Sequence, residues 1–187
     1  MHMDKTIISV LGGLGGMIGW GTSDFLANQS SEKIGHFKTF LWSQVSGLLL
    51  FAVVLLLLRP SFIFSPGLIV LLVIGAIGYS VGYLYFYKAF EVGNISVVSA
   101  AINLNTILAM SVAWVVFGQR LSFVQIGGVC AVIAGVILVS VNMRELFSGK
   151  VSLVKGIKET IVASILFGVV FWPVNEYITE RADWLAT

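Results

Sequence analysis

The sequence predicts an all-α fold, a polytopic transmembrane helix bundle, and three observations support that prediction. First, 58% of the 187 residues are hydrophobic and only 11% are charged, with a mean hydropathy of +0.99. Soluble domains have an apolar share of about 45–50% and about 25% charged residues. Second, the apolar residues lie in long runs, and about 20 helical residues at 1.5 Å each cross the ~30 Å core of a bilayer. Third, the last run repeats the residue pattern of the first.

The predicted spans follow one another with short polar or turn-forming segments between them. They are residues 7–27, 40–58, 68–90, 96–117, 123–141 and 157–178. The polar residues 28–38 predict an interfacial loop, and Pro60 ends the second span because proline biases the residue before it away from helix. Gly93 and Gly118 lie in predicted turns. Residues 142–156 are short, charged and partly amphipathic, which predicts an interfacial connector.

The repeat relates the first and the sixth span. Its matched pairs are Gly16 with Gly168, Trp20 with Trp172, Asp24 with Glu176, and Phe25 with Tyr177. Because the sixth span follows five others, it enters the bilayer from the side opposite to the first, and the repeat is inverted. We therefore predict a five-helix repeat in residues 7–141 and the first helix of a second, incomplete, inverted repeat in residues 157–187. The alternative is a chance likeness between two membrane helices.

Several function classes find no support in the residues. Cys130 is the single cysteine, so no internal disulfide is possible, and His2 and His36 are too far apart to form a metal cluster. No Ser/His/Asp or Cys/His grouping is present, so neither catalytic residues nor a cofactor is predicted. The net charge of +2, without a basic run and interleaved aromatics, excludes a nucleic-acid partner. The chain is not predicted to be an enzyme.

Two acidic residues, Asp24 and Glu176, lie at matched positions of the first and last membrane spans. Asp24 follows Trp20 by one helical turn, so both fall on one helix face, and Glu176 is its counterpart in the repeat. An ionisable group at the centre of a membrane helix costs ~2.5–3.5 kcal/mol on insertion scales and tends to face a water-filled path. Our hypothesis is that Asp24 and Glu176 flank a cavity and bind a cationic group or exchange a proton. The alternative is that each carboxylate is solvated at the interface.

The third span adds tyrosines and a lysine to the candidates. Tyr79, Tyr83 and Tyr87 are spaced i, i+4, i+8 and form one stripe, which offers hydroxyl groups to a substrate. An aromatic belt at the membrane surface is the alternative for this stripe, although Tyr79 lies deeper. Lys88 is either a cation facing the cavity, for a carboxylate or phosphate, or a side chain that snorkels to the headgroups.

Polar and small residues complete the pattern. Asn103 and Thr106 share a face in the middle of the fourth span, where they contact substrate or form interhelical hydrogen bonds. Glycines recur at helix-packing spacing, and we interpret them as structural contacts rather than ligand contacts. These stripes include Gly12 with Gly16, Gly15 with Gly19, Gly78 with Gly82, and Gly127 with Gly135.

The chain resembles the drug/metabolite transporter superfamily, specifically its EamA domain. The resembling segments are Trp20–Ser23, Tyr87–Phe90, Ala113–Leu121, Gln125–Gly128 and Ala134–Val136. The resemblance implies about five helices per repeat and two repeats in a complete protein. Two positions depart from the family pattern: Thr106 replaces a proline, which predicts a fourth helix without its usual bend, and Gln119 replaces a glutamate.

The combined interpretation is a multi-pass integral membrane protein of the plasma membrane. It is predicted to be a permease or exporter of small metabolites or drugs that works by alternating access, with proton coupling through Asp24 as a further hypothesis. The expected partners are a small-molecule solute, the lipid bilayer, and either a second copy in a homodimer or a C-terminal second repeat. The alternative function is a non-transporting membrane scaffold or lipid-handling subunit that dimerises through its glycine stripes.

Overall fold

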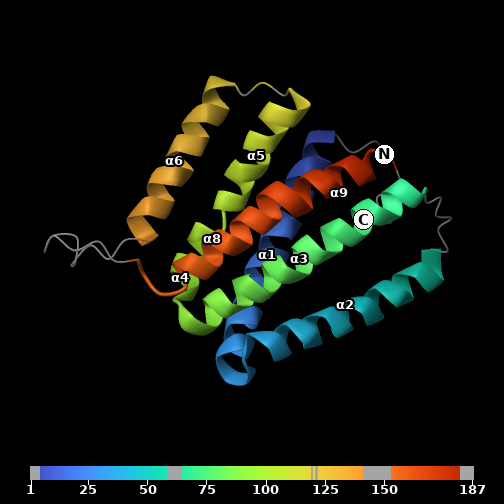
Figure 1. The fold of residues 1–187 in the computed structure, drawn as a ribbon, viewed down its shortest axis with the longest axis horizontal. Helices are drawn as coiled ribbons and strands as arrows, with labels where there is room; N and C mark the ends of the chain where they lie inside the picture. The colour runs from blue at the N-terminus through green and yellow to red at the C-terminus, as the bar shows by residue number, and fades with distance from the viewer. Residues whose placement is uncertain (1–4, 59–64, 119, 121, 141–152, 182–187) are drawn as a thin grey trace, which may run out of the picture.

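The computed structural model describes residues 5–58, 65–118, 120, 122–140 and 153–181, and the elements in them are helical (Figure 1). They are α1 (Lys5–Ile34), α2 (His36–Leu58), α3 (Pro66–Val92), α4 (Ile95–Ala101), α5 (Leu104–Phe117), α6 (Phe123–Ser140), α8 (Ile157–Ile165), the π-helix η1 (Leu166–Phe171) and α9 (Trp172–Thr179). The predicted all-α fold class is confirmed. Because α8, η1 and α9 follow one another without a break, we call Ile157–Thr179 the last helix.

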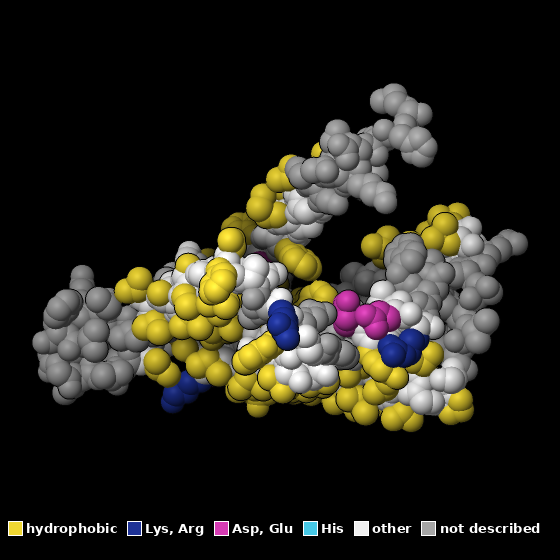
Figure 2. Space-filling model, turned by 90° about the horizontal axis from the view of Figure 1, so that it is seen from above, with side chains coloured by type: hydrophobic (Ala, Val, Ile, Leu, Met, Phe, Trp, Pro, Cys, Tyr) yellow, Lys and Arg dark blue, Asp and Glu magenta, His cyan; other side chains and the backbone are white. Residues whose placement is uncertain are grey.

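Four helical segments of the described chain are long and apolar enough to cross a membrane. They are His36–Leu58, Pro66–Val92, Ile95–Val116 and Ile157–Thr179. Phe123–Leu138 is apolar but shorter, and α1 is not among the four because glycines and polar residues dilute its apolar character. Hydrophobic side chains cover most of the described surface seen in Figure 2. The protein is a multi-pass integral membrane protein, since such a surface is stable only in lipid.

Helix α3 is the centre of the bundle. It packs against α1, α2 and every part of the last helix, which flanks it on the side opposite to α2 in Figure 1. The largest buried cluster lies at the C-terminal end of α3, where Phe86, Phe90 and Val98 meet Phe167 of the last helix. This end of the bundle is therefore tightly closed.

Close packing between α3 and the last helix depends on glycine. A Cβ added at Gly78 would lie 2.8 Å from the Val170 Cγ1, and one at Gly82 would lie 2.6 Å from the Phe167 Cε1. The predicted packing role of these two glycines is confirmed. The same prediction is wrong for the glycine stripes on α1 and α6. In the described chain, no neighbouring atom lies within 4 Å of a Cβ added at Gly12, Gly15, Gly16, Gly19, Gly127 or Gly135.

The predicted loop at residues 28–38 is wrong. Helix α1 continues to Ile34, and Gly35, with a φ of 83°, turns the chain directly into α2. The polar residues stay helical because tertiary partners satisfy them: the Asn28 Nδ2 donates to the buried carbonyl of Phe90 at 3.2 Å. Hydrogen-bond partners at the end of α3 thus outweigh the turn preference of the local sequence.

The fourth span bends despite the missing proline, so the expectation of an unbent helix is also wrong. The chain leaves regular helix at Ile102 and Asn103, between α4 and α5. The Asn103 Nδ2 donates to the carbonyls of Ser99 at 3.0 Å and Ala100 at 3.2 Å, so a side chain competes for acceptors that the helix backbone would use. The Ser164 hydroxyl donates to the Ile102 carbonyl at 3.4 Å.

The first and last helices run in opposite directions through the bundle. Asn28, near the C-terminal end of α1, contacts Phe90, near the C-terminal end of α3, so these two helices run in the same direction. Val174, near the C-terminal end of the last helix, instead lies beside Gly75, near the N-terminal end of α3. Most of the predicted connector, residues 142–156, lies outside the described residues. Its last residue, Gly156, has a φ of 89° and packs its backbone against Gly93, which fixes the start of α8 to the end of α3.

Candidate solute cavity

A cavity of about 610 Å³ lies between α1, α3, the α4–α5 break and the last helix. Its lining residues are Met17, Trp20, Gly21, Asp24, Tyr79, Tyr83, Phe86, Ser99, Ile102, Asn103, Asn105, Thr106, Ala109, Phe167, Phe171 and Trp172. Six of the eight residues predicted for a substrate path are in this set: Trp20, Asp24, Tyr79, Tyr83, Asn103 and Thr106. The volume falls within the range of about 300–1,000 Å³ that is usual for small-molecule sites.

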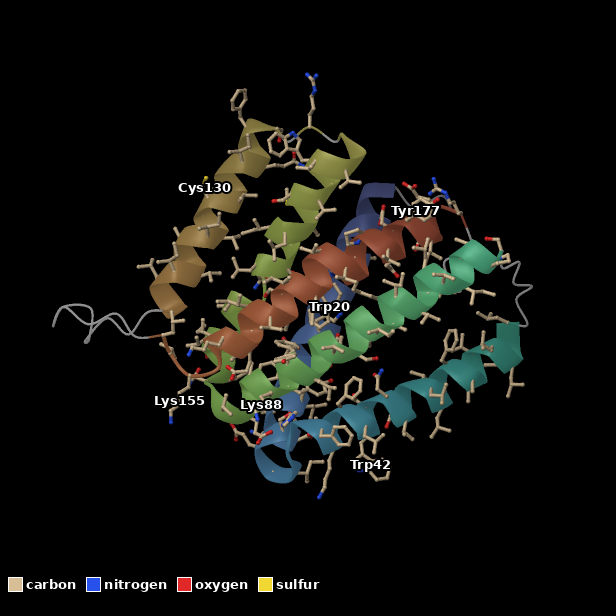
Figure 3. All side chains as sticks on the ribbon, viewed as in Figure 1. Trp20, Trp42, Lys88, Cys130, Lys155 and Tyr177 are labelled. Carbon is tan, nitrogen blue, oxygen red and sulfur yellow. The ribbon has the colours of Figure 1, made fainter. Side chains whose placement is uncertain are left out.

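The other two predicted residues lie elsewhere. Lys88 is near the C-terminal end of α3, close to the Glu91 carboxylate, and does not line the cavity. Glu176 lines an adjoining cleft of about 480 Å³ between α5 and α9, which shares Ala109 and Trp172 with the central cavity. Figure 3 shows Lys88 and Tyr177 at opposite ends of the bundle. Asp24 and Glu176 therefore do not face the same cavity in this conformation.

Among the described residues that line the central cavity, Asp24 alone has a charged side chain. It is partly buried, and the Ser99 hydroxyl of α4 is its hydrogen-bonding neighbour. The other polar lining groups are hydroxyls and amides, which are neutral. The cavity thus presents one carboxylate among neutral donors and acceptors, which favours a positively charged ligand group.

Aromatic rings form the wall of the cavity on the side of α3. The rings of Tyr79 and Tyr83 are in contact with centroids 4.5 Å apart and are tilted by 45°, as their i, i+4 spacing allows. Tyr83 contacts Phe167 edge-on at 5.0 Å, and Tyr79 contacts Phe171 at 5.1 Å. The last helix holds these rings in place because glycine positions on α3 let it approach closely. An apolar, aromatic wall of this kind binds the flat or bulky part of a ligand.

Several lining residues were not predicted from the sequence, although two of them carried a signal in it. Trp172 is the repeat counterpart of Trp20, and both tryptophans line the cavity. Ser99 precedes Asn103 by one helical turn, so a face of polar residues on the fourth span pointed to it. Phe167 and Phe171 gave no signal, because their position depends on how the last helix packs against α3.

The tertiary structure also brings together a polar cluster at the closed end. Glu91 at the end of α3 accepts hydrogen bonds from the His36 backbone amide at 2.8 Å and forms a contact of 2.5 Å with the His36 Nδ1. The Asn28 Nδ2 also donates to the Glu32 Oε1 at 3.1 Å. These contacts tie the α1–α2 corner to α3 rather than forming a metal site, and the described residues hold no group of three potential metal ligands.

A multi-pass helix bundle that encloses a partly polar cavity is the architecture of a membrane solute transporter. The chain belongs to the EamA-like transporter family, whose sequence pattern matches residues 7–141. This range is the one predicted for the first repeat, and the resemblance to the EamA domain is confirmed. No curated protein and no solved structure matches the chain significantly. The family consists of transporters, so the protein is a membrane transporter of the drug/metabolite transporter type.

Proposed function

We propose that this chain forms a substrate-binding unit of a plasma-membrane permease that exports small solutes by alternating access, and that the 610 Å³ cavity holds the solute. The observation that carries the proposal is that residues predicted for a substrate path lie together in the folded chain. Residues chosen from three separate spans of the sequence line one cavity, among them Trp20, Asp24 and Tyr83. When a few polar or ionisable side chains meet in one concave, mostly apolar site, that site is usually a binding site.

The lining groups favour an organic amine with an apolar body. The Asp24 carboxylate pairs with an ammonium group, and the faces of Tyr79, Tyr83 and Trp172 attract a cation and pack against a ring. The same carboxylate is a proton acceptor when no amine is bound. Exchange of a proton for the amine at Asp24 would couple export to the proton gradient.

The packing supports an asymmetric state of the kind that alternating access requires. At one end of the bundle the side chains of Phe86, Phe90 and Val98 are buried, and the backbones of Gly93 and Gly156 are in contact. The described residues of α5 and α6 carry many exposed apolar side chains, and these two helices make few contacts with each other. A bundle closed at one end and loosely packed at the other has distinct elements to open and close.

The proposal is tested by transport of tyramine, a small aromatic amine, into proteoliposomes with a pH gradient. Asp24→Asn is expected to lower the initial rate at least about tenfold, because a hydrogen bond to a charged group contributes about 1.5–3 kcal/mol. Asp24→Glu is expected to retain part of the rate. Glu159→Gln, in the first turn of α8 and outside the cavity, serves as the matched control. An unchanged rate in Asp24→Asn would refute the role of this carboxylate.

A second candidate is the non-transporting scaffold that dimerises through its glycine faces. The observation in its favour is that Gly12, Gly16 and Gly19 on α1 have no neighbour within 4 Å, so another helix could approach closely. Absence of flux for a panel of amines, together with a dimer that Gly16→Val dissociates, would favour this function. Tyramine transport that depends on Asp24 would exclude it.

A further inference from the structure

A second hollow lies on the outer side of the bundle, between α1 and α2, with α3 as its floor. It has a volume of about 440 Å³, and its lining residues are Ser23, Leu26, Ala27, Ser30, Ile34, Thr39, Trp42, Ser43, Ser46 and Tyr87. Six of the ten carry a hydroxyl group: Ser23, Ser30, Thr39, Ser43, Ser46 and Tyr87. We call this hollow the hydroxyl groove. It shares no lining residue with the central cavity.

The groove is unusual because it belongs to the most lipid-like part of the molecule. The rest of α2 exposes leucines and other apolar side chains along its length, among them Leu48, Leu56 and Leu57. Hydroxyl groups that face hydrocarbon without a partner are costly, so polar side chains in membrane helices face other polar groups. A cluster of hydroxyls at this position therefore offers hydrogen-bonding groups to a polar occupant, beyond the backbone carbonyls that Thr39 and Ser43 contact.

The hydroxyl groups on α2 act as acceptors toward the groove. The Thr39 Oγ1 donates to the Gly35 carbonyl at 3.0 Å, and the Ser43 Oγ donates to the Phe40 carbonyl at 2.8 Å. Their protons are used for backbone carbonyls, and the Ser43 hydroxyl also hydrogen-bonds with the Tyr87 side chain. Each hydroxyl oxygen has two lone pairs, so both can still accept from a donor in the groove. Trp42, with 63% of its surface exposed, adds an aromatic face. Acceptor oxygens beside an indole ring suit an ammonium group.

The position of the groove suits an amphipathic molecule. It starts beside the Gly35 corner, which is an end of the bundle, and Ser46 lies about 10 Å along α2 from Thr39 at 1.5 Å per residue. The buried residues Thr39 and Tyr87 form its polar floor, while Leu26 and Trp42 form an exposed apolar rim. A head group at the membrane surface would reach the floor while its hydrocarbon tail follows the rim.

Tyr87 and Tyr83 lie between the groove and the central cavity. Tyr87 lies in the floor of the groove, and its ring contacts that of Tyr83 edge-on at 5.5 Å. Tyr83 lines the central cavity, as does Asp24, which follows the groove residue Ser23 directly in α1. The side chains of Tyr83 and Tyr87 therefore separate the two hollows.

We propose that the hydroxyl groove is an entry site through which amphipathic amines pass from the bilayer to the central cavity. The ammonium group donates hydrogen bonds to the oxygens of Thr39, Ser43 and Ser46, and the apolar tail lies along Leu26 and Trp42. Rotation of Tyr87 and Tyr83 then opens the way to Asp24. The inference rests on the proposed function, because it extends the route of the amine that the central cavity binds.

Thiol protection tests occupancy of the groove without relying on transport. The variant Ser46→Cys is made in a Cys130→Ser background and labelled in proteoliposomes with benzyl methanethiosulfonate, which partitions into the bilayer. Dodecylamine at twice its Kd is expected to slow labelling about threefold, since the free fraction of the site falls by that factor. Leu56→Cys, on the exposed part of α2 outside the groove, is the matched control and is expected to show no protection.

A transport comparison separates the groove from the central cavity. The double variant Ser43→Ala with Ser46→Ala is expected to lower dodecylamine uptake at least about threefold, because two acceptors are lost. Uptake of the water-soluble tyramine is expected to stay within twofold of the parent rate. Asp24→Asn should reduce both.

Three outcomes overturn the inference. One is equal labelling of Ser46→Cys with and without dodecylamine, and another is equal dodecylamine uptake by the double variant. The third is a Ser46→Cys thiol that benzyl methanethiosulfonate does not label but that forms a disulfide between two copies of the chain. This result would show that a helix of the second copy covers the groove. If the parent protein does not transport tyramine, the proposed function is refuted instead. The protection experiment would still report whether dodecylamine occupies the groove.

Discussion

The first and last helices carry the same residue pattern in two different environments. At Gly168 of the last helix, an added Cβ would clash with the Asn105 carbonyl and lie 2.7 Å from the Leu108 Cβ of α5. At Gly16 of α1, nothing lies within 4 Å. Likewise, Trp20 is 67% exposed and Trp172 is 36% exposed, although both line the central cavity.

This difference shows that the shared pattern provides a surface for close packing but does not by itself supply the neighbour. The last helix lies between α3 and α5, and the backbone of Gly168 packs directly against α5. The N-terminal half of α1 presents the same kind of glycine surface with no described helix against it. The two helices therefore give matched sites at which a contact can be removed or added.

The largest expected effect comes from the matched glycines. Gly168→Ala is expected to lower the free energy of unfolding by about 1–3 kcal/mol, because the added methyl group overpacks the contact with α5. Gly16→Ala is expected to be neutral or to stabilise by up to about 1 kcal/mol, because alanine favours helix over glycine. Denaturation in detergent micelles would measure both values. Equal destabilisation by the two variants would contradict the packing difference.

The matched carboxylates should differ in transport rather than in stability. Glu176→Gln is expected to change the tyramine rate by less than about threefold, which is under ~0.7 kcal/mol, because Glu176 lies outside the central cavity. The corresponding change at Asp24 is expected to be the larger one. Measuring Glu176→Gln and Asp24→Asn side by side sharpens the comparison. A larger loss in Glu176→Gln would show that the cleft between α5 and α9 belongs to the transport path.

A modest effect on stability is expected where the first helix is tied to α3. Glu91→Gln weakens the contact with His36 and is expected to cost about 0.5–1.5 kcal/mol, since the pair is half-buried and one hydrogen bond to the backbone amide can remain. The free energy of unfolding measures this cost. The matched change at the far end of the last helix, Glu180→Gln, affects an exposed pair with Arg181 and should be close to neutral.

The smallest expected effect concerns the backbone of the last helix. Pro173 is the second residue after η1 and lacks an amide proton, so one of the usual helix hydrogen bonds to the preceding turn cannot form. Pro173→Ala is expected to change the free energy of unfolding by less than about 1 kcal/mol, because one restored hydrogen bond is offset by a more flexible unfolded chain. Hydrogen exchange of the amides in η1 would detect a tighter helix. Unchanged exchange would show that proline does not maintain η1.

Length and hydropathy were sufficient to predict the helical membrane class and most of the bundle. Spacing alone was enough to place Trp20 with Asp24, and Tyr79 with Tyr83, because neighbours at i+4 share a helix face regardless of tertiary structure. Their meeting in one cavity with Asn103 depends on packing, which no local pattern encodes.

The failures have a common physical cause. Residues 28–34 are polar, and only their contacts with the end of α3 keep them helical. The bend at Asn103 comes from a side-chain amide rather than from the proline that marks it in the family. Glycine spacing predicted packing on α3 but could not tell which stripes have a neighbour. In each case the decisive partner lies far away in the sequence or competes with the backbone locally.

The π-helix η1 has a consequence for the relation between the two acidic residues. Its backbone bonds join residues five apart instead of four, as the Trp172 amide does with the Phe167 carbonyl. Each such turn holds extra chain, so side chains beyond it are rotated in phase relative to those of an unbroken α-helix. Glu176 follows this segment, whereas Asp24 lies in an uninterrupted helix. The segment from Trp172 to Glu176 is therefore turned as one unit relative to the helix before η1. Within it Trp172 still lines the central cavity, as Trp20 does, whereas Glu176, one turn further along α9, lines the cleft beside α5.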